Sequence, residues 1–359
     1  MSDTKTVISY REALYQSMNT ALSESPEVVI MGQGVDDHKG TFGSTSNLAE
    51  KYGKERVFDI PLSEEGNTGI AIGAALNGLY PIQTHIRNDF SLLAMNQIVN
   101  TAAKYKYMYG GHFEVPFLIR MIIGRSWGQG AQHSQSFQSL FAHIPGLVVI
   151  MPSSADTVLE SYNYAVQKYK GPVISIEHRL LYDYNFNSNY NSNSNSQFKE
   201  NPFTSRLIRE GSDITIVATS IMVIEAQRVS DYLFREFKID CEIIDLHAIS
   251  HFNKEMILKS VKKTGKLIVA DTSWRAYGVC AEISRIVCET DPSMLKAPVV
   301  SLGMQPTPCP TTKKLEDLFY TDDYTFTKKI IELVKGKNHN IPMTERSMNE
   351  AYKNFKGPF

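Results

Sequence analysis

Short apolar runs alternate with longer helical patterns along this chain, and that alternation limits the folds it can adopt. In the first half, five runs rich in β-branched residues lie at 28–31, 57–60, 117–120, 147–150 and 173–176. Strands of a parallel sheet are buried on both faces and are joined by helices, so they give continuous apolar runs separated by helical stretches. The pattern therefore predicts a parallel sheet with helices on both faces.

The same alternation returns after a polar tract. Residues 185–197 read Asn-Phe-Asn-Ser-Asn-Tyr-Asn-Ser-Asn-Ser-Asn-Ser-Gln and offer little to bury, so we expect a loop or linker there. Apolar runs then recur at 214–218, 241–245, 267–270 and 299–302. A chain of 359 residues exceeds the usual size of a single core. We therefore predict two three-layer α/β/α domains with mostly parallel sheets.

The changes in composition along the sequence also set the expected domain boundaries. The first domain is predicted at 1–182 and the second at 203–335, with an Asn/Ser-rich loop or linker at 183–202 between them. Residues 336–359 are polar and are expected to form a tail that wraps a partner or is loosely held.

Composition excludes several classes of protein. The formal net charge is -1, which does not favour binding to nucleic acid or to an anionic membrane surface. No apolar run approaches the roughly 20 residues of a membrane helix. The first residues show neither an apolar signal core nor an Arg-rich transit pattern. The cysteines form no CxxC pair, so we expect no metal site and reduced structural thiols in a cytoplasmic protein.

Two carboxylates follow the second predicted strand, in Asp59-Ile60-Pro61-Leu62-Ser63-Glu64-Glu65-Gly66. Loops after the carboxyl ends of parallel strands build the active sites of such sheets, so Glu64 and Glu65 are candidate functional residues. The alternative is a solvated acidic pair at a helix start, where the helix dipole favours negative charge.

The next helix, predicted to begin near Gly66, is built of very small residues. Glycines lower helix stability by about 1 kcal/mol each relative to alanine, so we expect another backbone to pack closely and offset that cost. The spacing of Gly66, Gly69 and Gly73 is not GxGxxG, and Gly32-Gln33-Gly34 is followed by Asp37 where a third glycine belongs. Nicotinamide binding by a Rossmann fingerprint is therefore not expected.

His133 lies in Gly130-Ala131-Gln132-His133-Ser134-Gln135-Ser136, a polar stretch without helix or strand periodicity. A histidine in such a loop is suited to donate a proton or contact an anion near neutral pH. A hydrogen-bonded loop histidine without a catalytic role is the alternative.

Together these segments resemble the β chain of the thiamine diphosphate-dependent decarboxylating component of 2-oxo acid dehydrogenase complexes, of the pyruvate and branched-chain types. The resemblance covers most of the chain, in one order, and rests on the segments at 10–14, 63–75, 96–105, 132–136, 143–147, 260–266 and 278–283. It implies a transketolase-like pyrimidine-binding domain followed by a transketolase C-terminal-like domain.

The resemblance also implies roles for single residues. Glu64 falls on the catalytic glutamate that hydrogen-bonds the cofactor's aminopyrimidine and promotes its imino tautomer, and burial is expected to raise the pKa of Glu64. Phe90 falls on the aromatic residue that packs against the pyrimidine, and Ile86 on an apolar neighbour. His133 falls on the active-site histidine. Glu65 keeps the interpretation of a helix-starting carboxylate.

The family's diphosphate and Mg²⁺ module carries Gly-Asp-Gly, which this chain lacks. The resemblance therefore implies that the chain is inactive alone and that a separate α chain completes each site in an α2β2 heterotetramer. It further implies a small 2-oxo acid substrate and a lipoyl acyltransferase core as a further partner.

Two departures keep other functions open. Gln33-Gly34 replaces an acidic residue linked in relatives to communication between paired sites, and the segment 85–90 is unusually polar. Arg87 in that segment suits a polar or phosphorylated substrate, although a surface ion pair explains it equally well. The alternative function is therefore a stand-alone carboligase or transketolase-like enzyme with a polar aldehyde acceptor. A regulatory or assembly subunit is a third possibility.

Overall fold

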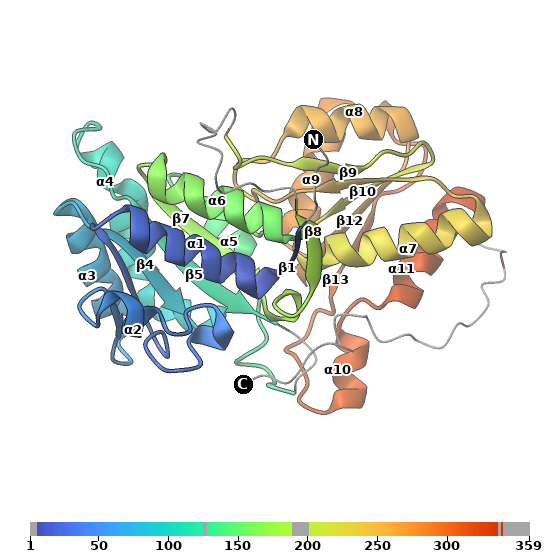
Figure 1. The fold of residues 1–359 in the computed structure, drawn as a ribbon. Coiled ribbons are helices and arrows are strands. Elements are labelled where there is room, and N and C mark those ends of the chain that lie inside the picture. The colour runs from blue at the N-terminus through green and yellow to red at the C-terminus, as the bar shows by residue number, and fades with distance from the viewer. Residues whose placement is uncertain (1–5, 125–127, 189–200, 337–338, 340–359) are drawn as a thin grey trace, which may run out of the picture. The chain divides into compact units, whose positions relative to one another are not determined.

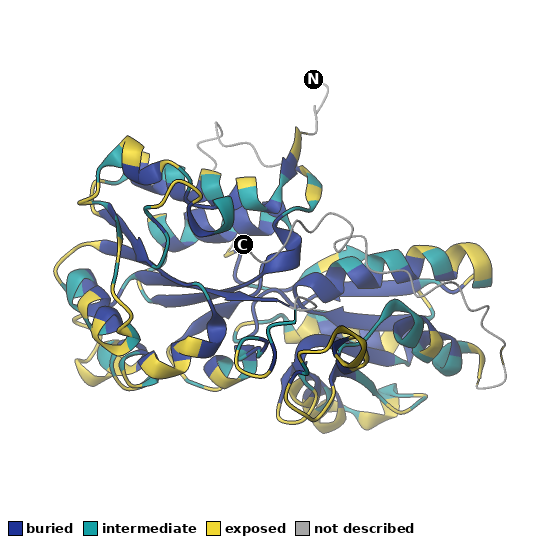
Figure 2. Cartoon of the chain, turned by 90° about the horizontal axis from the view of Figure 1, so that it is seen from below, coloured by how far each residue is buried: buried dark blue, intermediate teal, exposed yellow. Residues whose placement is uncertain are grey.

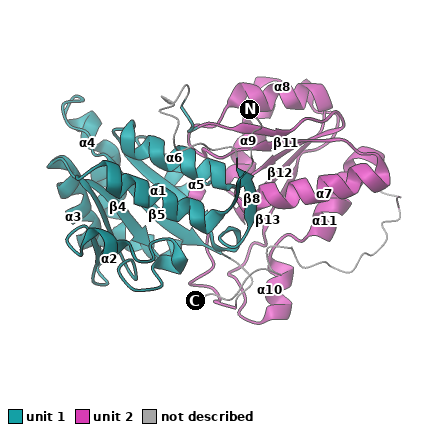
Figure 3. Cartoon of the chain, viewed as in Figure 1, with its two compact units in different colours: residues 1–124, 140–203, 357–359 teal, residues 125–139, 204–356 magenta. Residues whose placement is uncertain are grey.

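The computed structural model describes residues 6–124, 128–188, 201–336 and 339. The chain divides into two compact units (Figure 3). Unit 1 consists of residues 1–124, 140–203 and 357–359, and unit 2 of residues 125–139 and 204–356. The short segment before residue 140 is thus grouped with the later part of the chain. All of the predicted tail except Gly336 and His339 lies outside the described residues.

Unit 1 is built on a six-stranded parallel sheet with the order β3-β2-β4-β5-β7-β6. Its strands are β2 Val28–Gly32, β3 Val57–Asp59, β4 Tyr80–His85, β5 Phe117–Ile123, β6 Val148–Ile150 and β7 Pro172–His178. The five apolar runs of the first half all form strands of this sheet, as predicted. A separate antiparallel pair joins β1 Thr6–Ser9 to β8 Asn185–Ser188.

Helices cover both faces of this sheet (Figure 1). On one face α1 and α6 pack against each other, and the β5 residue Arg120 contacts Met18 of α1 there. On the other face α3 packs on β4, where Gln83 donates to Thr68 at 3.0 Å. The helices are α1 Tyr10–Glu24, α2 Leu48–Tyr52, α3 Glu64–Leu76, α4 Ala103–Met108, α5 Gln138–Ala142 and α6 Ala155–Gln167, with 3-10 turns η1 Thr41–Gly43, η2 Asn88–Ala94 and η4 Arg179–Leu181 and the π-helix η3 Asn96–Ala102.

Unit 2 has a five-stranded sheet with the order β13-β12-β10-β11-β9, in which only β9 runs antiparallel to its neighbour. Helix α7 packs on β10, β11 and β12 and is covered by α11, while α8 packs on β10 and α9 on β12. The bounds are β9 Arg206–Arg209, β10 Ile214–Ala218, β11 Cys241–Asp245, β12 Leu267–Trp274, β13 Val300–Met304, α7 Ile221–Phe237, α8 Lys254–Thr264, α9 Val279–Thr290, η5 Pro292–Met294, α10 Lys313–Phe319 and α11 Asp323–Lys335. The predicted class of two α/β units with mostly parallel sheets is confirmed.

Local capping explains where several helices begin and end. Ser154 and Thr157 form a capping box at the start of α6, which satisfies backbone groups that the first turn leaves unpaired. Asn253 accepts from Met256 N at the start of α8, and that helix ends at Gly265 in the left-handed region with φ 72°. Only glycine adopts this conformation without a steric cost.

The structure corrects two expectations about the strands. The polar tract was predicted to be a loop, yet its first four residues form β8, because their backbone groups pair with β1 and a two-stranded ribbon needs no apolar run. The rest of the tract, from residue 189 to 197, lies outside the described residues. Strand β4 was not predicted at all, because Pro81, Gln83, Thr84 and His85 break its apolar pattern.

Buried residues concentrate in the two sheets and on the inner faces of the helices (Figure 2). Every residue of β2, β4, β5 and β7 is buried. Within the described part of the chain, no helix is long and apolar enough to cross a membrane.

Candidate active site

Glu64 is the first residue of α3, directly after the loop that follows β3. The side chain of Asn67 donates to the Pro61 carbonyl at 2.7 Å and closes this loop, which fixes the helix start two residues before the predicted one. Glu64 is half-buried and Glu65 is exposed. Among the described residues, Glu64 is therefore covered only in part, which is less than the burial that was expected.

The segment after β4 carries the other residues predicted to hold the cofactor. Ile86 is half-buried, and Phe90 is 38% exposed on the 3-10 turn η2. Turn η2 and the π-helix η3 both pack along α3, where Asn96 donates to Glu65 at 3.0 Å. The structure thus brings the helix of Glu64 and the segment of Ile86 and Phe90 together in unit 1.

Polar groups in this segment are buried without hydrogen-bond partners among the described residues. They include the Thr84 hydroxyl, Nε2 of His85 and both amide atoms of Asn88. Burial lowers the pKa of His85 to about 4. A buried polar group without a partner costs about 1–3 kcal/mol, so several together indicate a site that another molecule completes.

Arg87 points away from solvent. It is 8% exposed, its Nη1 donates to the Ile86 carbonyl at 2.9 Å, and its guanidinium carbon lies 5.7 Å from the centre of the Phe42 ring. Burial lowers the pKa of Arg87, and the charge of Asp89 opposes that effect. Arg87 is therefore buried in this chain, and both of its predicted roles stay predictions.

A second arginine contacts the same aromatic ring. Arg179, after β7, has its guanidinium carbon 4.8 Å from the Phe42 ring centre, and its Nη1 lies 3.3 Å from Asp183 Oδ2. Asp183 also pairs with Arg11 at the start of α1. Burial, together with the neighbouring positive charges of Arg11 and Arg87, lowers the pKa of Arg179 to about 10.

A fully buried ion pair links two neighbouring strands of the unit 1 sheet, β5 and β7. Arg120 on β5 donates to Glu177 on β7 through Nε at 2.7 Å and Nη2 at 2.8 Å, and neither side chain is exposed. Tyr162 and Tyr182 both donate to Glu177. The sequence pattern did not indicate this network, because Arg120 and Glu177 lie 57 positions apart within two apolar strands.

His133 belongs to unit 2, whereas Glu64, Ile86, Arg87 and Phe90 belong to unit 1. It is half-buried in a non-helical segment, and its backbone N–H donates to the Gly130 carbonyl at 3.4 Å. The residues that follow it, up to Gln138, make buried hydrogen bonds to β12. Sequence reasoning missed this anchoring because it joins residues more than 130 positions apart.

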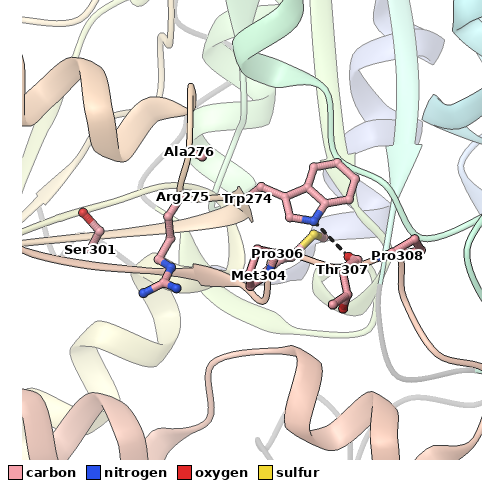
Figure 4. A pocket seen from close by; sticks show the side chains of 8 residues that line it. All are labelled: Trp274, Arg275, Ala276, Ser301, Met304, Pro306, Thr307 and Pro308. Carbon is pink, nitrogen blue, oxygen red and sulfur yellow. Dashed lines mark hydrogen bonds between the residues drawn. The ribbon is translucent and has the colours of Figure 1, made fainter.

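Unit 2 also contains a surface pocket of about 660 Å³ that none of the predicted residues lines (Figure 4). Its wall is mainly apolar, and Trp274 Nε1 donates to the Thr307 carbonyl at 3.1 Å on one side of it. The lining residues are Trp274, Arg275, Ala276, Ser301, Met304, Pro306, Thr307 and Pro308. In the described part of the chain, no group of three or more His, Cys, Asp or Glu residues is placed to hold a metal ion.

Each of the two units matches a domain of the transketolase-like class. Residues 6–184 match the family described as "Transketolase, pyrimidine binding domain", and residues 204–324 match "Transketolase, C-terminal domain". A solved structure titled "Split gene transketolase, inactive beta4 tetramer" shares the fold, with a TM-score of 0.71 at 21% identity over 92% of this chain and 99% of that one.

Curated relatives specify the family further. The pyruvate dehydrogenase E1 component subunit beta-2, mitochondrial, of Oryza sativa subsp. japonica is 37% identical over 85% of this chain and 81% of its own length. The mitochondrial pyruvate dehydrogenase E1 component subunit beta of Saccharomyces cerevisiae is 35% identical over 93% of this chain and 90% of its own length. The pyruvate dehydrogenase E1 component subunit beta of Rickettsia conorii is 35% identical over 91% of this chain and 97% of its own length. The chain belongs to the family of pyruvate dehydrogenase E1 component β subunits.

Proposed function

We propose that this chain is the β subunit of a two-chain, thiamine diphosphate-dependent 2-oxo acid dehydrogenase, with pyruvate as the first substrate to test. The observation that carries the proposal is the position of Glu64 at the start of α3, packed along the segment of Ile86 and Phe90, in a unit that matches a pyrimidine-binding domain. The names of the curated relatives support the reaction class.

The residues at this edge fit the flat, polar-edged pyrimidine ring of the cofactor. Phe90 offers an exposed aromatic face, Ile86 an apolar wall and Glu64 a half-buried carboxyl group. Asn88 adds an amide whose two polar atoms are buried and have no partner in the described part of the chain. When bound, thiamine diphosphate supplies the carbon centre that accepts the 2-oxo acid and stabilises the electron pair left by decarboxylation.

Each residue then has a defined task. Phe90 packs against the ring, Ile86 excludes water from its edge, and the carboxyl group of Glu64 holds a proton at a ring nitrogen. We assign His133 to the substrate-derived part, where an imidazole can donate a proton or hold an oxyanion.

A separate α chain completes the site in this proposal. It holds the diphosphate and its Mg²⁺, and it covers the half-buried Glu64 in an α2β2 heterotetramer. The outer face of α3 supports this, because Ile70 is 65% exposed and no described atom outside the helix lies within 4 Å of a Cβ built on Gly73. The expected close backbone is therefore absent from the described chain, and a partner's backbone can take that place. A lipoyl acyltransferase core as acceptor and a cytoplasmic location remain parts of the proposal.

The test is co-expression with a candidate α chain, followed by calorimetric titration with thiamine diphosphate and Mg²⁺ and by decarboxylation assays on a panel of 2-oxo acids. We expect cofactor binding by the pair, none by the β chain alone, and turnover of at least one 2-oxo acid. A pair that forms but does not bind the cofactor would contradict the proposal. Reductive acylation of a lipoyl domain then separates the dehydrogenase from a carboligase.

One observation favours the second candidate, a carboligase for a polar or phosphorylated acceptor. Two buried arginines, Arg87 and Arg179, lie over the Phe42 ring at the edge where parallel sheets bind ligands. For Arg87→Ala we expect kcat/KM to fall selectively for phosphorylated acceptors. The matched control is Arg56→Ala, because Arg56 binds only backbone carbonyls of Leu22, Ser25 and Val28 in the hydrogen bonds that we identify for it. An equal effect of Arg87→Ala on all substrates removes this candidate.

A further inference from the structure

The segment that carries His133 has two faces of different character. Ser134, Ser136 and Gln138 are buried, whereas His133, Gln135 and Phe137 are half-buried. Burial on alternate residues is the pattern of an extended chain with one face against the protein. The buried face of this segment is entirely polar, so its hydrogen bonds decide which way the other face, with His133, is turned.

Those hydrogen bonds run to the end of β12. Ser136 Oγ donates to Gln138 Oε1 at 2.6 Å and lies 3.2 Å from Thr272 Oγ1, and the Ser136 carbonyl accepts from Ser273 Oγ at 2.7 Å. Gln138 Nε2 donates to Asp271 Oδ1 at 2.7 Å. Two of the three buried polar side chains of the segment, Ser136 and Gln138, are thus held against the strand.

Asp271 is the centre of this network. It is 2% exposed, and its Oδ1 accepts from Gln138, from Thr219 Oγ1 at 2.6 Å and from Thr272 N at 2.8 Å. Hydrogen bonds to a buried carboxylate are about twice as strong as neutral ones. Burial raises the pKa of Asp271, and its hydrogen-bond donors oppose that effect.

The other end of the segment is anchored as well. Gly128 N donates to Glu316 Oε1 at 3.3 Å. A Cβ added to Gly130, which has φ 72°, would lie 2.8 Å from Thr311 Oγ1. His133 therefore lies between two fixed points within unit 2.

We propose that Gln138 and Asp271 are positioning residues that hold the His133 segment in the register that turns the imidazole outward from β12. The inference rests on the proposed function only where it gives that orientation of His133 a catalytic role. The hydrogen bonds themselves exist in the single chain, so they can be tested without the α chain or the cofactor.

The experiment compares full-length Gln138→Leu, Asp271→Ala and Asp271→Asn with the unchanged chain. The amide hydrogen-exchange rate is measured for the peptides covering 128–139 and for those of β10 and β12. The rate of carbethoxylation by diethyl pyrocarbonate reports on the exposure of the His133 ring. For Gln138→Leu and Asp271→Ala we expect exchange at 128–139 to accelerate about tenfold or more, because a buried hydrogen bond to a charged group is lost. The carbethoxylation rate of His133 should rise with it. Asp271→Asn keeps the accepting Oδ1 and should restore slow exchange.

The matched control is Thr215→Val, which removes a different buried hydroxyl network of unit 2, with Ser260 and Thr264 both 2.7 Å away. It should leave exchange at 128–139 and the His133 rate unchanged. Unchanged exchange at 128–139 in Gln138→Leu overturns the inference, and so does an equal acceleration throughout unit 2. Failure of the α/β pair to bind thiamine diphosphate would refute the proposed function and leave this result standing.

Discussion

Gly73 allows the folding of this chain and its assembly with a partner to be tested separately. It lies in the middle of α3, and no described atom outside that helix lies within 4 Å of a Cβ built there. Gly73→Ala should therefore stabilise the isolated chain by roughly 1 kcal/mol, because alanine loses less backbone entropy in a helix. In a unit of about 190 residues this raises the melting temperature by about 2–4 °C.

A larger side chain at position 73 should instead weaken assembly with the α chain. If an α chain packs its backbone on this face, Gly73→Leu overpacks the interface by about 1–3 kcal/mol and weakens association about 5- to 150-fold. Thermal melts of the isolated chain and sedimentation titrations with the α chain measure the two effects. Gly78→Ala is the control: its position is also open, but its φ of 94° makes alanine cost about 1–2 kcal/mol. Wild-type affinity of Gly73→Leu for the α chain would refute the reasoning.

Three further predictions concern buried or reactive charges. Glu64→Gln should reduce turnover of the α/β pair severely while circular dichroism and melting stay unchanged, and near-normal turnover would return Glu64 to a helix-starting role. Arg120→Met should cost about 3–5 kcal/mol in urea unfolding because it leaves Glu177 charged and buried, whereas adding Glu177→Gln should recover part of the loss. His85, with its pKa lowered to about 4, binds a proton more weakly when folded than when unfolded, so stability is complete above about pH 6.5 and falls by about 3 kcal/mol toward pH 4. His85→Gln should flatten that part of the pH profile, and an unchanged slope would contradict the assignment.

The sheets were largely predictable from the sequence because strands buried on both faces need continuous apolar runs. Strand β4 escaped because Gln83 faces Thr68 of α3 and is buried with a hydrogen-bond partner, which a hydropathy pattern cannot anticipate. Strand β8 was not predicted because it is stabilised by backbone pairing with β1 and not by an apolar pattern. In both cases the missing information is a partner distant in sequence.

The same reason limits what the sequence reveals of the site. Phe42 adopts φ 51°, a conformation that phenylalanine rarely takes, and its ring is contacted by Arg87 and Arg179, which follow two different strands. The pairing of Gln138 with Asp271 joins positions 133 residues apart. Glu64 and His133 were first singled out by their positions in the sequence, and only the family resemblance gave them roles, which stay predictions. The residues that support them follow no local pattern.

Several features of unit 1 that a single chain leaves incomplete support one inference. The half-buried Glu64, the exposed Phe90, the open face at Gly73 and the unpartnered amide of Asn88 all belong to α3 or to the segment that packs along it. By contrast, the buried Arg120 and Glu177 pair with each other through two hydrogen bonds. Sequence features that favour the stability of a single chain are often missing at functional sites. A stand-alone protein would gain stability by covering Phe90 and by replacing Gly73 with alanine, so the open face favours the proposal that an α chain covers it.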